Sequence, residues 1–322
     1  MSHELIIDQH GTIKKIDTPY TPNIPEEYPD KKRRFQLYKQ TDEVLIRSRQ
    51  IVEAFEIGQK EATWMPTPEY PELPLMILLM TDTHYGSARA NTNLINEHLD
   101  IVKETPNFYM VHNGDHVDNF NAVVGLGDGT FEDPLPPQIA SRAWAEKLME
   151  LDKLKKIGVL GFGNHDDFGA GVGQDWYDTF LSKFRCPIFT SGGLLHILLG
   201  DKVVYDLAMQ HKYWGYSKLN PTNTLKRLQE HEYPDADILF TGHTHQSEGL
   251  HFERGGKDRI GVVGGTYKDE DVWARKQGIG GRAGQPGWVV ALWQNERKMV
   301  LFKDIKVAQD FLLDKVFRVH GI

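Results

Sequence analysis

Five largely apolar runs along the chain each stop at polar residues whose side chains carry carboxylate, amide or imidazole groups. Short continuous apolar runs are typical of strands that are covered on both faces, as in a parallel or mixed sheet. The runs span residues 75–80, 108–111, 157–162, 203–209 and 238–240. They are followed by Asp82 and His84, by Asp115 and Asp118, by Asn164 and His165, by His211, and by His243 and His245. Because open α/β sheets place their sites beyond the carboxyl ends of strands, we expect these side chains to meet in one crevice.

Amphipathic segments between these runs predict helices. We expect helices at residues 41–61, 91–104, 138–153, 174–184 and 222–231, the second of them capped by Asn91. Residues 194–199 and 202–209 predict a hairpin, and residues 261–263, 288–293 and 299–302 predict further strands. Strands alternate with helices early in the chain and cluster later, which favours a layered α/β sandwich with mixed sheets.

The first part of the chain has a different composition from the rest. Residues 1–30 are polar and rich in proline, which predicts an extended arm or a loosely packed strand. The expected helix at 41–61 precedes a linker with prolines at positions 66, 68, 71 and 74. We therefore expect an N-terminal extension at residues 1–69 and a main domain at residues 70–322. An amphipathic helix needs a surface to bury against, so the extension is a candidate for homo-oligomer formation.

Size and charge exclude some classes of protein. The chain has 322 residues, of which 40% are hydrophobic, so it can bury a large core. Its formal charge of −8 argues against a uniformly basic surface for nucleic acid, although a local basic groove stays possible. The single cysteine, Cys186, excludes an internal disulfide, and the N-terminus has no secretory signal pattern. No apolar run approaches the ~18 residues of a membrane span. We expect a cytoplasmic protein that does not bind a membrane.

The polar residues after the apolar runs form a candidate metal-ligand set: Asp82, His84, Asp115, Asn164, His211, His243 and His245. Each motif alone is compatible with an ordinary polar turn, but all of them in this order are much harder to obtain by chance. Oxygen and imidazole ligands without a thiolate suit Mn²⁺, Fe or Zn²⁺ in a catalytic site. The set is too large for one ion and fits two ions that share a carboxylate.

In this order the motifs resemble those of the calcineurin-like metallophosphoesterases, over about residues 75–265. The matching motifs are Asp82-Thr83-His84, Gly114-Asp115 with Asp118, Gly163-Asn164-His165-Asp166, His211, and Gly242-His243-Thr244-His245. The resemblance implies a four-layer αββα sandwich with two mixed β-sheets, and a dinuclear metal site at the strand ends. One ion would be held by Asp82, His84, Asp115 and His245, and the other by Asp115, Asn164, His211 and His243. His165 would be a catalytic residue over the phosphate, oriented by Asp118.

Departures from the family pattern bear on the substrate. Protein phosphatases of the family carry an arginine after the second motif and another before Gly-Asn-His, whereas this chain has Asn119 and Phe162. The chain is more similar to the repair nucleases of the family, which favours phosphodiesters such as DNA, RNA or nucleotides. A phosphomonoesterase acting on a small metabolite is the alternative enzyme. A non-catalytic scaffold is the other alternative, although every ligand position is filled.

Two further features have two interpretations each. His116 follows Asp115 and either is a buried histidine that supports the ligands or contacts substrate. Residues 268–284 combine glycines with Trp273, Arg275 and Lys276, which suits either phosphate contact and base stacking or a mobile surface loop.

Overall fold

A computed structural model describes residues 4–7, 13–16, 60–119, 133–168, 183–200, 203–217, 219–270 and 284–320. The chain divides into two compact units, Met1–Phe55 and Glu56–Ile322, which are described separately. In the first unit, strands β1 (Glu4–Ile7) and β2 (Ile13–Ile16) form an antiparallel pair, in the region where the sequence predicts an extended arm or strand. Residues 41–59 of the helix expected at 41–61 lie outside the described residues.

The first sheet of the second unit holds the strands of the first three apolar runs. Its order is β14-β13-β4-β5-β6-β7. The strands are β4 (Leu75–Met80), β5 (Phe108–Asn113), β6 (Ile157–Gly161), β7 (Ile188–Phe189), β13 (Val289–Leu292) and β14 (Met299–Phe302). Strands β4 to β7 are parallel, whereas β13 and β14 run antiparallel at one side. The sheet is therefore mixed, as expected.

The second sheet has the order β11-β12-β10-β9-β8-β3. Its strands are β3 (Glu61–Trp64), β8 (Gly193–Leu199), β9 (Val203–Gln210), β10 (Ile238–Thr241), β11 (Ser247–Arg254) and β12 (Lys257–Gly264). The expected hairpin is present as the antiparallel pair β8 and β9. Strand β10 lies parallel to both β9 and β12, so the carboxyl ends of β9 and β10 open at the same edge.

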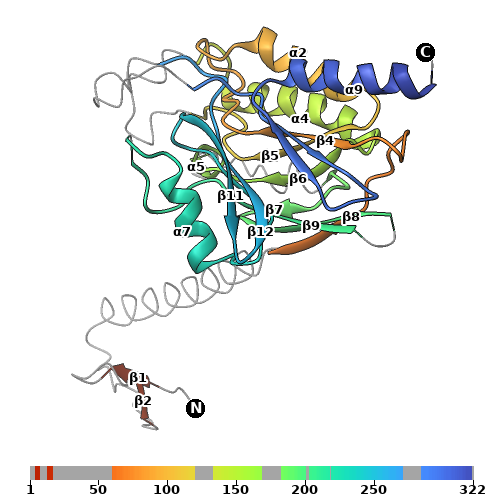
Figure 1. The fold of residues 1–322 in the computed structure, drawn as a ribbon. Coiled ribbons are helices and arrows are strands. Elements are labelled where there is room, and N and C mark those ends of the chain that lie inside the picture. The colour runs from red at the N-terminus through yellow and green to blue at the C-terminus, as the bar shows by residue number, and fades with distance from the viewer. Residues whose placement is uncertain are drawn as a thin grey trace, which may run out of the picture. The chain divides into compact units, whose positions relative to one another are not determined.

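Helices cover the outer face of each sheet (Figure 1). Helices α2 (Thr92–Glu104), α4 (Pro137–Lys153) and α9 (Ile305–His320) lie over the first sheet, and α7 (Asn223–His231) lies over the second. The short helix α5 (Asn164–Phe168) follows β6 directly. Asn91 caps α2 as expected, because its side-chain oxygen accepts a hydrogen bond from the Leu94 N–H at 3.0 Å.

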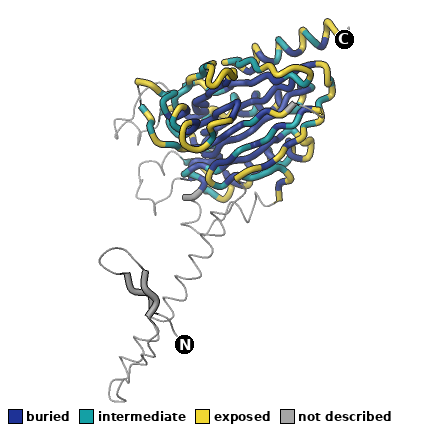
Figure 2. The backbone as a smooth tube through the Cα atoms, turned by 60° about the horizontal axis from the view of Figure 1, so that its bottom comes forward, coloured by how far each residue is buried: buried dark blue, intermediate teal, exposed yellow. Residues whose placement is uncertain are grey.

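Alternation along β4 shows how the layers are held together. Ile77 and Leu79 point into the apolar core between the two sheets, whereas Leu78 and Met80 point into the core under α2, α4 and α9. A third core joins α7 to the outer face of the second sheet. Figure 2 shows the buried backbone of the sheets enclosed by more exposed segments. The order helix, sheet, sheet, helix confirms the predicted four-layer αββα sandwich.

Several elements differ from the sequence prediction. Strand β3 pairs with β8, although the sequence placed residues 61–64 in the N-terminal extension. Its alternation of two buried residues, Ala62 and Trp64, with two exposed ones is too short to separate a strand from the end of a helix. Strands β7 and β11 and helices α5 and α9 were not predicted at all. Residues 174–182 of the helix expected at 174–184 lie outside the described residues.

Candidate metal centre

The candidate ligands come from the carboxyl ends of parallel strands in both sheets. Asp82, Asp115 and Asn164 follow β4, β5 and β6 of the first sheet. His211 follows β9 and His243 follows β10 of the second sheet. The two sheets pack face to face, so their strand ends meet along one edge.

Backbone strain is concentrated at these strand ends. Eight non-glycine residues have a positive φ among the described ones, and five of them are candidate ligands. These five are Asp82 (50°), His84 (44°), Asp115 (53°), His243 (68°) and His245 (56°). Such left-handed conformations cost about 1 kcal/mol or more each, and they persist where the surrounding structure imposes them. These conformations therefore lower the stability of the fold, and they turn the side chains inward.

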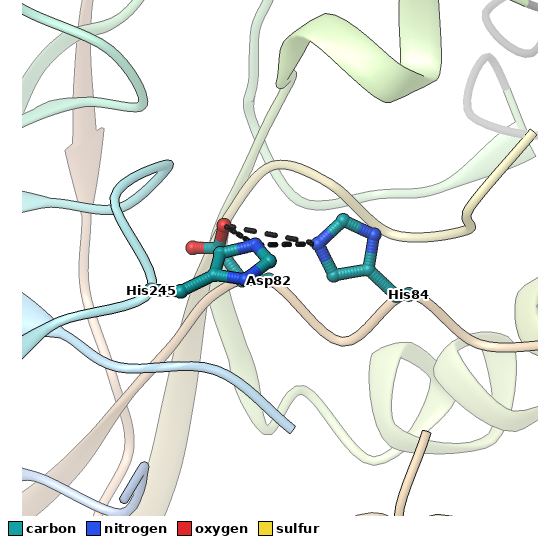
Figure 3. Close-up of side chains that lie close together, drawn as sticks. All are labelled: Asp82, His84 and His245. Atoms are coloured by element: carbon teal, nitrogen blue, oxygen red, sulfur yellow. Dashed lines mark hydrogen bonds and ion pairs between the residues drawn. The ribbon is translucent and has the colours of Figure 1, made fainter. Parts of the chain in front are cut away.

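Asp82, His84 and His245 form a first cluster, drawn in Figure 3. The Nε2 atom of His245 lies 3.4 Å from Asp82 Oδ1 and 3.0 Å from Nε2 of His84. The Asp82 carboxylate is itself held in place, because Thr81 Oγ1 and the His243 N–H donate hydrogen bonds to it.

Asp115, His211 and His243 form a second cluster. Asp115 Oδ2 lies 3.1 Å from Nε2 of His211 and 3.9 Å from Nε2 of His84. One carboxylate oxygen therefore faces ligands of both clusters, as a bridging ligand must.

Two polar atoms at this edge suit a divalent cation. Oδ1 of Asn164 is buried without a hydrogen-bond partner among the described residues, and such an atom is costly. Nδ1 of His211 donates to the Asn113 carbonyl at 2.6 Å, so Nε2, which faces Asp115 Oδ2, is the nitrogen that would bind an ion after losing its proton.

Charge at the site also suits a metal ion. Burial lowers the pKa of His84 and of His243 to about 4, so both rings are neutral at physiological pH. Burial alone would lower the pKa of His211, but the carboxylates of Asp115 and Asp82 raise it to about 10. Burial alone would raise the pKa of Asp115, but His211 and His165 hold it well below its usual range. Ionised carboxylates and neutral imidazoles are the forms that bind metal, and His211 would release a proton on binding.

Asp166 holds two of the loops together. Its carboxylate accepts hydrogen bonds from the backbone N–H groups of Asp115 (2.9 Å), His116 (3.0 Å) and Gly163 (2.8 Å). Gly163 permits this approach, since a Cβ atom there would lie 2.1 Å from Asp115 Oδ1. The sequence contains Asp166 within its Gly-Asn-His-Asp motif but does not indicate this role.

The arrangement of Asp118 differs from the one that the resemblance implies. Its Oδ1 lies 2.8 Å from Nδ1 of His84 and 3.4 Å from Nδ1 of His165. His165 Nδ1 instead lies 2.5 Å from the backbone carbonyl oxygen of Asp118. The carboxylate of Asp118 thus orients His84 more directly than His165, and its backbone fixes the His165 ring.

His116 is fully buried behind the ligands, which corrects the expectation of substrate contact. Its Nε2 lies 3.0 Å from the Gly161 carbonyl oxygen, and its Nδ1 accepts a hydrogen bond from Trp144 Nε1 at 2.9 Å. Its ring stacks on His112 with a centroid separation of 3.8 Å. The alternative from the sequence, a buried histidine that supports the site, fits this geometry.

Lys268 is the residue that sequence reasoning placed differently. Its Nζ lies 2.5 Å from Asp118 Oδ2, and only 3% of the side chain is exposed. The sequence grouped Lys268 with a surface segment, because nothing in the local pattern connects it to a residue 150 positions earlier. Arg275 and Lys276 lie outside the described residues, so their contact with substrate stays a prediction.

A comparison with protein families supplies the decisive observation. The model of the calcineurin-like phosphoesterase family matches residues 75–247, which is more than half of the chain. The chain belongs to this family. It is therefore a metal-dependent phosphoesterase, as the motifs predicted, and its strand-end clusters are the candidate ligands of that metal.

Several solved structures are similar to this chain. Vps29 from Entamoeba histolytica, in a complex with zinc, is 13% identical with a TM-score of 0.36, covering 70% of this chain and 97% of Vps29. A putative 5'-nucleotidase from Staphylococcus aureus is 11% identical with a TM-score of 0.42, covering 75% of this chain and 58% of the nucleotidase. A metallophosphoesterase from Sphaerobacter thermophilus is 14% identical with a TM-score of 0.32, covering 75% of this chain and 94% of its own.

Two further findings are negative. No curated protein matches the sequence of this phosphoesterase. Among the helices of the described residues, none combines the length and the apolar content that a membrane crossing requires.

Proposed function

We propose that this phosphoesterase hydrolyses phosphodiesters, with nucleic acids or nucleotides as the substrate class. The observation that carries the proposal is the absence of the two phosphatase arginines. Asn119 occupies one of the positions, is almost fully buried, and donates from Nδ2 to the His165 carbonyl oxygen at 3.0 Å. Phe162 occupies the other position.

Charge explains why this substitution favours diesters. A phosphomonoester carries about −1.5 to −2 charge at neutral pH, whereas a diester phosphate carries one negative charge. A site that lacks two fixed cations beside the metals balances a single negative charge better than a double one. Phosphodiesters are therefore the better match.

Two divalent ions would be held by the two clusters, with Asn164 completing the second and Asp115 shared between them. We propose Mn²⁺ as the metal, with Fe or Zn²⁺ as alternatives that the same oxygen and nitrogen ligands accept. Such a pair supplies positive charge for the phosphoryl oxygens and lowers the pKa of bound water.

The protein's own groups then have distinct tasks. Asp118 and the Asn113 carbonyl orient His84 and His211, so that Nε2 of each faces the ligand cluster. His165 holds its Nδ1 against the Asp118 backbone and has 14% of its side chain exposed, more than the buried ligands His84 and His211. We propose that Nε2 of His165 donates a proton to the leaving oxygen of the substrate, which is the role of a general acid.

The test compares bis-p-nitrophenyl phosphate with p-nitrophenyl phosphate, each with Mn²⁺, Mg²⁺, Zn²⁺ or a chelator. We expect faster hydrolysis of the diester, dependent on Mn²⁺ and abolished by the chelator. Faster hydrolysis of the monoester would contradict the diester proposal and favour a metabolite phosphatase. An absence of turnover despite bound metal would favour a scaffold.

A cytoplasmic location and a homo-oligomer formed through residues 1–69 also remain proposals. They rest on the single cysteine and the amphipathic pattern at 41–61. Gel filtration with light scattering tests the second of them.

A further inference from the structure

Lys268 and Asp118 form an ion pair that is almost completely removed from solvent. Lys268 Nζ lies 2.5 Å from Asp118 Oδ2, and the exposed fractions of the two side chains are 3% and 2%. A buried ammonium group is costly unless it is paired and hydrogen-bonded. With so little exposed surface, the Lys268 ammonium group faces the Asp118 carboxylate rather than a substrate phosphate.

The backbone around Lys268 is fixed to the same loop that carries Asp82. Thr266 Oγ1 accepts a hydrogen bond from the Lys268 N–H and donates one to the Asp82 carbonyl, both at 3.0 Å. The Tyr267 N–H also donates to the Asp82 carbonyl, at 3.1 Å. An isolated β-bridge joins Lys268 to Ala90. The ammonium group is therefore delivered by a rigid segment.

The Asp118 carboxylate connects this segment to a candidate ligand. Lys268 holds Oδ2, and Oδ1 lies 2.8 Å from Nδ1 of His84. Because each oxygen of the carboxylate is held by a different partner, a rotation of the carboxylate would break both contacts. The orientation of the His84 ring, and of its Nε2 in the first cluster, thus depends on both contacts.

We propose that Lys268 is a positioning residue that acts through Asp118 to orient His84, and so sets the affinity of the cluster of Asp82, His84 and His245 for a divalent ion. The inference rests on the proposed metal binding at this cluster and is independent of the preference for diesters.

The second cluster provides an internal comparison. His211 is oriented by the backbone carbonyl of Asn113, at 2.6 Å, which no side-chain substitution at position 268 removes. The positioning role of Lys268 therefore predicts a selective effect on one of two ion sites. A general loss of folding would weaken both.

The experiment measures Mn²⁺ binding to the metal-free protein by calorimetry. Lys268→Met should weaken the site that contains His84 by about 10- to 100-fold, the usual effect of removing a partner behind a metal ligand, and leave the other site unchanged. His243→Asn, which removes a ligand of the second cluster, identifies the transition that belongs to the first.

Lys156→Met is a matched control. Lys156 is a partly buried lysine that donates to the Thr105 carbonyl at 3.0 Å, near the start of β5 and at the opposite end from the site. It should bind both ions as the wild type does. Equal weakening of both sites in Lys268→Met, or no weakening, would overturn the inference.

A double variant keeps the test decisive if an unpaired Asp118 charge prevents folding. Asp118→Asn combined with Lys268→Met removes both charges together. If Lys268 acts through Asp118, as proposed, the double variant should bind Mn²⁺ as Asp118→Asn alone does, and a further loss would overturn the inference. A wild type that binds no Mn²⁺ would instead contradict the proposed function itself.

Discussion

Nε2 of His84 and Nε2 of His245 lie 3.0 Å apart, although 161 residues separate them in the chain. The first follows a strand of one sheet, and the second follows a strand of the other. Without an ion, one of the two nitrogens must carry a proton to avoid repulsion between lone pairs, and a metal ion would displace it. The packing of the two sheets against each other therefore sets the geometry of this candidate metal site.

Asp115 is the residue whose substitution should affect both clusters. Asp115→Asn replaces an ionised oxygen that faces His211 and His84 with a neutral amide, which is a weaker ligand for a divalent cation. We expect the metal content measured by elemental analysis to fall from about two ions per chain to less than one.

Asp152→Asn is the control for this variant. Asp152 is a buried carboxylate that accepts from the backbone N–H groups of Arg185 and Cys186, outside the site. It should keep both ions. If Asp115→Asn also kept two tightly bound ions, Asp115 would not be a bridging ligand.

His165 should matter most for substrates with a poor leaving group. His165→Asn removes the proposed proton donor, which typically contributes about 10²–10⁴-fold to the rate. An alkoxide needs that proton, whereas p-nitrophenolate leaves almost unaided. We therefore expect a loss in this range on a dinucleotide and a smaller loss on bis-p-nitrophenyl phosphate, measured as kcat with saturating metal.

The metal content of His165→Asn separates the alternatives. Two retained ions with an equal loss on both substrates would leave His165 only a charge-stabilising role. Loss of an ion would refute the assignment more fully, because His165 would then be a ligand.

Arg275 and Lys276 should affect large substrates only, if residues 268–284 contact phosphates beyond the scissile one. Replacing both with alanine should raise KM for an oligonucleotide and leave KM for bis-p-nitrophenyl phosphate unchanged, since the small diester does not extend that far. Steady-state kinetics on both substrates measure the effect. A KM that is the same as wild type on the oligonucleotide would rule the contact out.

The candidate ligands could be named from the sequence because each has a local signal, and their metal binding stays a prediction. Asp82 and His211, for example, each lie two residues after an apolar run, and a strand end is where an α/β fold exposes such residues. The four layers could be predicted for a similar reason, since strands covered on both faces require helices outside them.

The remaining features depend on contacts between distant segments. Lys268 meets Asp118 across 150 residues, and β3 pairs with β8 across more than 130 residues. In helix α9, Ile305, Ala308 and Leu312 are spaced as on one face of a helix. They follow the predicted strand at residues 299–302 closely, and the sequence pattern did not separate a helix from that strand. Orientation of a carboxylate such as Asp118 toward one of two nearby histidines is a difference of less than 1 Å, which no sequence pattern encodes.

Strand β3 gives a prediction about truncation. Trp64 is 9% exposed and contacts the Tyr109 ring edge-on at 5.4 Å between centroids. Loss of a buried tryptophan costs about 3–5 kcal/mol, so a protein that starts at residue 70 should unfold at a clearly lower temperature. A protein that starts at residue 56 keeps β3 and should melt clearly above the protein that starts at residue 70, with the wild-type metal content. Equal melting temperatures for both truncated proteins would show that β3 adds little stability.

His98 should make the stability depend on pH between about 4 and 6.5. It is 3% exposed, lies 2.7 Å from the Tyr267 hydroxyl through Nδ1, and burial lowers its pKa from 6.5 to about 4. The unfolded chain gains a proton at His98 as the pH falls below 6.5, whereas the folded chain stays neutral there down to about 4. Above pH 6.5 this histidine therefore has almost no effect on the free energy of unfolding. As the pH falls through that window, it lowers the free energy of unfolding progressively. At pH 5 the loss should be about 2 kcal/mol.

The measurement is urea unfolding with a chelator at pH 7.5 and at pH 5, for the wild type and for His98→Gln. Other buried histidines also destabilise the folded state in acid, so both proteins should lose stability. The free energy of unfolding of the wild type should fall by about 2 kcal/mol more than that of His98→Gln over this interval. His251→Gln is the matched control, because His251 is an exposed histidine on β11 and should fall as the wild type does. An equal fall in all three proteins would mean that His98 is protonated in the folded state well above pH 5, with its ring reached by solvent.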